Sequence, residues 1–418
     1  MAGTFPKTSA NATSHILELD GVRGVAIALV VLYHYFYVPS LAAPGSFVWH
    51  LSAPLRIGWT GVDLFFVLSG FLIGGILLDA RGSSNYFRTF YIRRFYRIVP
   101  LYALVLVGSF GFVLLLERGV WPQFQWMMAN RLPWASYVFY LQNFWMPVKD
   151  SFGFAFLGGT WSLAVEEQFY LTLPLLIWLL EPRQLRKVIL AAIVAAPLLR
   201  TALFVWRPDN YFFRYVLLPC RADALFLGVL AAMAIRDPAG RRWLESRGRL
   251  LASLIALLLL GCALLVHFGS SVESVPMQTF GYSWMALLYA VVILYALTQK
   301  SSWLSRCFRF HPLRRLGRIA YGVYLFHSIA IMVLAGWLLP NHPIRSGWPA
   351  LNSLPYLGFT LVVLIVTLAF CELSWHFFEK PLVQFGHRWK YEKNLAPLPP
   401  VEQTSIAASG SQEFPVSN

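Results

Sequence analysis

Charged side chains are scarce in this 418-residue chain, at 13%, whereas 58% of its residues are hydrophobic and its mean hydropathy is +0.59. This balance excludes an ordinary soluble domain, in which about a quarter of the residues are charged. Acidic residues are especially few, at 19 against 34 basic ones, and the net charge is +15. The basic residues fall between apolar runs rather than on an amphipathic surface element. The sequence therefore predicts an integral membrane protein, in contact with lipid and without a nucleic-acid partner.

Cysteine is also rare. The four cysteines are Cys220, Cys262, Cys307 and Cys371, far apart and without the paired spacing of a zinc, haem or redox motif. We expect them to be packing residues, and we expect no metal. A cleavable signal peptide is missing too, because the first fifteen residues are polar and the next apolar run is too long and lacks a small-residue cleavage site. The first span should therefore stay in the mature protein.

Apolar runs of about 17–25 residues, the length that crosses a bilayer as a helix, recur along the chain. The predicted spans are 18–38, 60–79, 98–116, 161–180, 188–206, 219–235, 250–269, 281–299, 319–339 and 355–377. A weaker run at 133–147 is short and bounded by prolines, which favours an interfacial or re-entrant segment. Both termini in the cytoplasm would place most basic residues in cytoplasmic segments, and an eleventh crossing would spoil that asymmetry.

The expected fold class is all-α, a polytopic membrane protein of about ten transmembrane helices around a polar central cavity. It would comprise a polar cytoplasmic N-terminal segment at 1–15, a transmembrane domain at 16–385 and a cytoplasmic tail at 386–418. From about residue 394 the tail is rich in proline, serine and glutamine, so we expect it to be disordered.

The first span, ILELDGVRGVAIALVVLYHYFYV, carries two polar side chains that are costly in a membrane, Arg23 and His34. Eleven residues are three helical turns plus about 20° and about 16 Å of rise, so both point the same way. An arginine at depth costs about 2.5–3.5 kcal/mol and usually faces a protein interior or a water-filled cavity. We expect a polar pathway along this face. The alternative for His34 is a neutral histidine bonded to a backbone carbonyl.

The span TWSLAVEEQFYLTLPLLIWLL contains adjacent carboxylates, Glu166 and Glu167. The predicted topology places them in the outer half of the membrane with His34, where one carboxylate could orient and charge a histidine base. Neighbours on a helix point about 100° apart, so only one can face His34. We expect the other to pair with an arginine.

Basic residues cluster in FYIRRFYRIVP, where Arg94 and Arg97 share a helix face beside Arg93. Two guanidinium groups so placed could clamp phosphates. The alternative is a topology signal or a contact with anionic lipid.

Weaker signals come from other spans. Residues with an expected substrate-binding or structural role are Asp63, Ser69, Trp161, Arg221, Asp223, Tyr324, His327 and Glu379. Ser69 lies among glycines typical of close helix packing. We interpret Arg221 and Asp223 as a polar pair at the membrane edge, and His327 as a core histidine. Glu379 should pair with a loop arginine.

The ordered set of motifs resembles the acyltransferase-3 family of multi-pass membrane enzymes over about residues 16–385. The motifs are Arg23 and His34 at their spacing, GVDLFFVLSGFLI, the pair Arg94 and Arg97, WSLAVEEQFY, RADALFLG, YGVYLFH and SWHFFEKP. The resemblance implies transfer of an acyl group from cytoplasmic acyl-CoA to a hydroxyl, commonly on an extracytoplasmic sugar. It points to His34 as the catalytic histidine, to Arg23, Arg94 and Arg97 as donor-site arginines, and to Glu166 as the motif glutamate.

The resulting hypothesis is an O-acyltransferase of the bacterial inner membrane that uses acyl-CoA, most simply acetyl-CoA, as donor and a carbohydrate or glycosylated acceptor. The arginines would hold the phosphates in the cytoplasm, His34 would deprotonate the acceptor and Glu166 would orient the imidazole. Direct transfer and a covalent acyl-histidine both remain open. The main alternative is a transporter or flippase, which the lack of an internal repeat or of matching broken spans disfavours. A non-catalytic scaffold is a third possibility.

Overall fold

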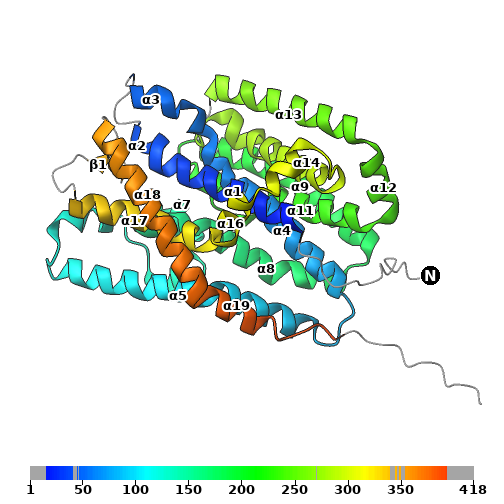
Figure 1. Ribbon diagram of the computed structural model, residues 1–418, viewed down its shortest axis with the longest axis horizontal. Coiled ribbons are helices and arrows are strands. Elements are labelled where there is room, and N and C mark those ends of the chain that lie inside the picture. The colour runs from blue at the N-terminus through cyan, green and yellow to red at the C-terminus, as the bar shows by residue number, and fades with distance from the viewer. Residues whose placement is uncertain are drawn as a thin grey trace, which may run out of the picture.

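The computed structural model describes residues 16–40, 45, 47–269, 271–338, 344–345, 348–349 and 354–392. These residues form a bundle of long helices, with α13 and α5 on opposite sides in the view of Figure 1. The expected N-terminal segment 1–15 and the tail from residue 393 lie outside the described residues. Residues 386–392, predicted as the start of the tail, are described and pack against the bundle.

The first half of the chain comprises α1 (Leu17–Leu32), η1 (Tyr33–Tyr37), α2 (Val38–Ser40), α3 (Phe47–Ser52), η2 (Ala53–Thr60), α4 (Gly61–Ala80), α5 (Tyr86–Glu117), η3 (Pro122–Met128), α6 (Trp134–Val138), α7 (Gln142–Lys149), η4 (Ala155–Thr160), α8 (Trp161–Leu179) and α9 (Pro182–Trp206). The second half comprises α10 (Phe212–Tyr215), α11 (Leu218–Arg236), α12 (Pro238–Ser246), α13 (Gly248–Gly269), η5 (Met277–Gly281), α14 (Tyr282–Thr298), α15 (Trp303–Phe308), α16 (His311–Arg318), α17 (Ala320–Leu338), α18 (Leu354–Ser374), η6 (Trp375–Glu379) and α19 (Lys380–Gly386). A two-stranded antiparallel ribbon, β1 (Ile344–Arg345) and β2 (Trp348–Pro349), follows α17.

Nine helical segments of the described chain are long and apolar enough to cross a membrane. They overlap nine of the ten predicted spans, which confirms an all-α polytopic membrane protein. The tenth predicted span, 161–180, is the 19-residue helix α8, which falls outside that set. The weaker run 133–147 forms the short helices α6 and α7, both too short to cross.

Burial separates inner helices from lipid-facing ones. In the 18-residue apolar stretch within residues 49–80, a segment that includes α4, 78% of the residues are buried. In the corresponding stretch of α9, only 17% are buried. Inner helices pack closely because glycines face neighbouring backbones. A side chain at Gly70 would overlap the Leu225 carbonyl of α11, and one at Gly24 would overlap the Leu313 carbonyl of α16. The glycines beside Ser69 therefore act in helix packing, as predicted.

The four short helices between α5 and α8 determine where α8 begins. Phe124 of η3 packs on Gly336, near the end of α17, whereas the Gly159 carbonyl of η4 accepts a 2.9 Å hydrogen bond from Tyr324 in the second turn of α17. The segment 122–160 thus contacts α17 near its end through η3 and near its start through η4. As a result, α8 begins deep inside the bundle, near the start of α17.

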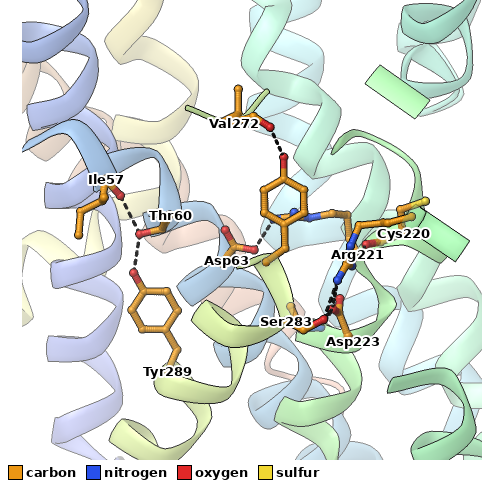
Figure 2. Close-up of polar contacts among 12 residues, drawn as sticks. Ile57, Thr60, Asp63, Cys220, Arg221, Asp223, Val272, Ser283 and Tyr289 are labelled. Carbon is orange, nitrogen blue, oxygen red and sulfur yellow. Dashed lines mark hydrogen bonds and ion pairs between the residues drawn. The ribbon is translucent and has the colours of Figure 1, made fainter. Parts of the chain in front are cut away.

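Two buried ion pairs join the inner helices. Arg221 of α11 pairs with Asp63 of α4, and Arg200 of α9 pairs with Asp223 of α11 at 2.9 Å, all four side chains being at most 1% exposed. Figure 2 shows Asp63 directed at Arg221, and Ser283 at Asp223. The predicted Arg221–Asp223 pair at the membrane edge is therefore wrong. Residues two apart on a helix point about 200° apart, so each one meets a different helix.

The last helices lie beside α5 (Figure 1). We call the end of the bundle that carries Arg93, Arg94 and Arg318 the basic end. The ring of Tyr96 in α5 lies 4.9 Å from that of Phe385 in α19, and residues 387–392 continue along α5. This contact brings the described C-terminal residues to the basic end.

Candidate functional site

A cavity of about 500 Å³ enters the bundle from the basic end. It is lined by residues of α1, α4, α5, α8, α16, α17, η6 and α19 and of the segment after α19. The predicted residues on its wall are Arg23, Ser69, Arg94, Arg97, Glu166 and Tyr324. The structure thus brings the three predicted donor-site arginines into one cavity, although they come from two separate helices.

Positive charge dominates the cavity. Five arginines line it, Arg23, Arg93, Arg94, Arg97 and Arg318, against the two carboxylates Asp20 and Glu166. Arg23 lies 3.3 Å from Asp20. Arg94, Arg97 and Arg318 form no ion pair with any described residue, although Arg94 and Arg97 lie over the rings of Tyr170 and Trp375. A cavity with unpaired guanidinium groups suits an anionic ligand that carries several charges.

Glu166 belongs to this cavity and not to the surroundings of His34. It interacts with Arg23 and Arg94 and with the hydroxyl groups of Ser69 and Tyr170, which are 2.6 Å apart. Arg23 precedes His34 by about 16 Å of helix rise, so the expected contact between Glu166 and His34 is not formed. The physical reason is the deep start of α8, which places its first turns at the level of Arg23.

Glu167 and Glu379 also differ from expectation, since neither forms an ion pair with a described arginine. Glu167 Oε1 is buried and without a hydrogen-bond partner among the described residues. Ser374 donates a hydrogen bond to the Glu379 carboxylate at 3.4 Å. Arg97 interacts with this carboxylate electrostatically, but from beyond ion-pair distance. Both carboxylates are carried by segments whose packing, rather than charge, fixes their position.

His34 lies in η1, a single π-helical turn that ends α1. Such turns are frequent at functional sites. Its Nδ1 is 2.9 Å from the Val30 carbonyl, which can only accept, so in the neutral ring the proton is on Nδ1 and Nε2 carries the lone pair. A backbone carbonyl therefore takes the orienting role that the sequence suggested for Glu166.

His327 of α17 lies next to His34, with ring centroids 5.1 Å apart. Its Nδ1 is 2.8 Å from the Tyr324 carbonyl, and its side chain is buried at 2% exposure. The sequence interpretation of His327 as a core histidine agrees with this burial, but its position beside His34 could not be foreseen.

Tyr324 separates the cavity from the two histidines. Its ring lines the cavity and lies 5.9 Å from that of His327, and its hydroxyl bonds to Gly159 and Ser162. His34 does not line the cavity. The expected continuous pathway from Arg23 to His34 is therefore closed at Tyr324, because those hydrogen bonds hold the ring across it.

The lining residues that were not predicted as site residues include Arg318, His387 and Tyr391. Burial and the charges of Arg93, Arg94 and Arg97 lower the pKa of His387. Tyr391 and His387 follow the last helix in a segment that the sequence assigned to a tail. Trp161, by contrast, packs against Tyr215 at 4.6 Å in the core. The described residues contain no group of side chains that could hold a metal ion.

Comparison with known proteins adds independent information. A family model described as an acyltransferase domain matches residues 16–375. No solved structure matches significantly.

Curated relatives include the peptidoglycan O-acetyltransferase OatA of Listeria monocytogenes, which is 28% identical over 397 residues, covering 91% of this chain and 58% of the relative. YrhL of Bacillus subtilis, provisionally named for the same activity, is 30% identical over 391 residues, covering 90% of this chain and 56% of the relative. The chain thus spans less than two thirds of the length of these relatives.

Proposed function

Because the chain belongs to the acyltransferase family whose domain model matches residues 16–375, we propose that it is a membrane O-acetyltransferase that moves an acetyl group from acetyl-CoA to a carbohydrate hydroxyl. The single observation that carries this proposal is the arginine-lined cavity, which ends at Tyr324, next to the pair of histidines His327 and His34. Peptidoglycan is the first acceptor to test, because the relative from Listeria monocytogenes is named for it.

The donor binds at the basic end with its phosphates on Arg94 and Arg97. Neither guanidinium group is within ion-pair distance of a carboxylate of the described residues, and phosphates form strong charge-assisted hydrogen bonds with arginine. Basic residues concentrate on the cytoplasmic side of membrane proteins, so the basic end faces the cytoplasm of a bacterial cell, where acetyl-CoA is made. The phosphates then stay out of the hydrocarbon, where an unpaired charge would be prohibitively costly.

The thioester end of the donor extends inward along the apolar part of the cavity toward Tyr324. Phe65 lines this part, its ring centre 6.0 Å from that of Tyr324, and such an apolar surface suits an uncharged pantetheine arm. Rotation of the Tyr324 ring, which breaks its hydrogen bonds to Gly159 and Ser162, opens the way to His34. The acceptor approaches His34 from the opposite side of the membrane.

His34 acts as general base. Its Nε2 accepts the proton of the acceptor hydroxyl while the hydroxyl oxygen forms a bond to the thioester carbonyl carbon. The carbon–sulfur bond then breaks, the electron pair goes to sulfur, and the imidazolium returns the proton to the CoA thiolate. The Val30 carbonyl holds the imidazole in the tautomer that this step needs.

The test uses the purified full chain in proteoliposomes with acetyl-CoA and a soluble peptidoglycan fragment. Free CoA thiol and the O-acetylated fragment should appear in equal amounts, and the His34→Gln variant should form neither above background. A transporter would move a substrate without releasing CoA thiol, and that outcome would overturn the proposal.

A further inference from the structure

The chain does not leave the bundle at the end of α19. Residues 387–392, here called the C-terminal strap, run along α5, and hydrogen bonds hold residues 389–392 to it and to the residue before it, Asn85. Arg93 Nε donates to the Trp389 carbonyl at 2.7 Å, and Asn85 Nδ2 donates to the Lys390 carbonyl at 2.9 Å. The backbone N–H of Glu392 donates a hydrogen bond to Asn85 Oδ1 at 3.0 Å. The strap is thus a fixed part of the basic end.

Arginine side chains also hold the aromatic residues of the strap. The guanidinium of Arg88 lies 4.7 Å from the ring centre of Trp389, and that of Arg93 lies 5.1 Å from the ring centre of Tyr391. Cation–π contacts of this kind are worth about 0.5–1 kcal/mol at exposed sites. They orient the strap so that one of its faces looks into the cavity.

Two strap residues, His387 and Tyr391, line the cavity together with Arg93 and Arg94. The Tyr391 hydroxyl is buried and has no hydrogen-bond partner among the described residues. A buried hydroxyl rarely stays unpaired, because it loses its bonds to water without replacement. The Tyr391 hydroxyl can therefore donate a hydrogen bond to a ligand, and it lies beside two arginines.

The positions of His387 and Tyr391 in the cavity determine which part of the donor they can contact. Tyr391 and His387 stand at the basic end of the cavity, whereas Tyr324 and Ser162 stand at its inner end. In acetyl-CoA the thioester and the phosphorylated nucleotide are at opposite ends of the pantetheine arm. If the thioester reaches Tyr324, the nucleotide phosphates lie at the strap.

We propose that the C-terminal strap is a nucleotide-phosphate subsite, in which the Tyr391 hydroxyl and the His387 imidazole donate hydrogen bonds to phosphate oxygens of the 3′-phospho-AMP part of the donor. This inference rests on the proposed function. It assigns to residues 387–392 a ligand-binding role that lies outside the matched family region, which ends at residue 375.

The experiment measures binding of two probes, CoA and 4′-phosphopantetheine, to the detergent-purified full chain by isothermal titration calorimetry. The variants are Tyr391→Phe and His387→Gln. Each should weaken CoA binding about tenfold, the usual effect of losing one hydrogen bond to a charged group. Binding of 4′-phosphopantetheine, which lacks the nucleotide, should change less than twofold.

Tyr96→Phe is the matched control, since Tyr96 packs between α5 and α19 but does not line the cavity. It should bind both probes like the unchanged protein. Unchanged CoA binding by both strap variants would overturn the inference alone, and so would equal weakening of both probes. Absence of CoA binding to the unchanged protein would instead overturn the proposed function.

Discussion

The imidazole rings of His34 and His327 lie 5.1 Å apart, and each directs its Nδ1 at a backbone carbonyl of its own helix. Both neutral rings therefore carry their lone pair on Nε2. His34 is half-buried, whereas His327 is almost fully buried, so His34 is the ring that an acceptor can reach. The backbone carbonyl of Val30 therefore orients the base in the proposed reaction.

The first prediction concerns His34. The His34→Gln variant should lower the rate of acetyl transfer by about 100- to 10,000-fold, because a general base contributes that much and an amide cannot take up the proton. Its affinity for CoA should change less than twofold, since His34 does not line the cavity. Rates come from release of CoA thiol. His50→Gln, which changes an exposed histidine, is the control and should transfer normally.

The second prediction concerns the arginines. Arg94→Gln and Arg97→Gln should each weaken CoA binding by about 10- to 100-fold, the loss expected for a charge-assisted hydrogen bond to phosphate. The effect should appear mainly in KM. Arg118→Gln, at an exposed position beyond the other end of α5, removes the same charge and should leave KM unchanged. Normal KM values for both cavity variants would show that the phosphates bind elsewhere.

The third prediction concerns the buried pair of Figure 2. Asp63→Asn leaves the Arg221 charge without its partner in a fully buried position, which should lower the free energy of unfolding by about 3–5 kcal/mol. Thermal unfolding in detergent measures the change. The double variant Asp63→Leu with Arg221→Met removes both charges and should unfold at a higher temperature than Asp63→Asn. Equal stability of Asp63→Asn and the unchanged protein would contradict this role.

The fourth prediction concerns pH. Burial and the nearby charges of Arg93, Arg94 and Arg97 hold the pKa of His387 below its ordinary value, so the empty site keeps this ring neutral near pH 7. Bound phosphate offsets the arginine charges and raises the pKa, so binding takes up a proton. CoA affinity should therefore increase as the pH falls from about 7 toward the lowered pKa. Calorimetric titrations with CoA in buffers of different ionisation enthalpy measure how many protons are taken up on binding. Proton uptake that persists in His387→Gln would assign it to another group.

Much of the fold follows from hydropathy. The long apolar runs became helices because their backbone polar groups must be satisfied within the segment in a membrane. The prolines that bound the run 133–147 correctly indicated that it does not cross. The spacing of Arg94 and Arg97 likewise gave a shared helix face, and both line the cavity.

Contacts between distant segments were less predictable. Glu166 was assigned to the level of His34 because its helix was assumed to start at the membrane surface. The short helices of residues 122–160, which move that start inward, carry no strong periodic signal. The partners of Arg221 and Asp223 come from α4 and α9, and a single sequence does not reveal which helices are neighbours.

The position of the C-terminal strap could not be predicted from the sequence. Residues 387–392 are polar and aromatic and follow the last apolar run, as a solvent-exposed tail would. Their position depends on Asn85, Arg88 and Arg93, about 300 residues earlier in the chain. Such contacts leave no local pattern in the sequence.

The most direct test of the central claim is a single-turnover measurement with acetyl-CoA carrying a labelled acetyl group, the purified protein and a peptidoglycan fragment. The account predicts that the label moves to a hydroxyl of the fragment at a rate that falls at least about 100-fold in His34→Gln, while that variant still binds CoA. Transfer by His34→Gln at the rate of the unchanged protein would contradict it.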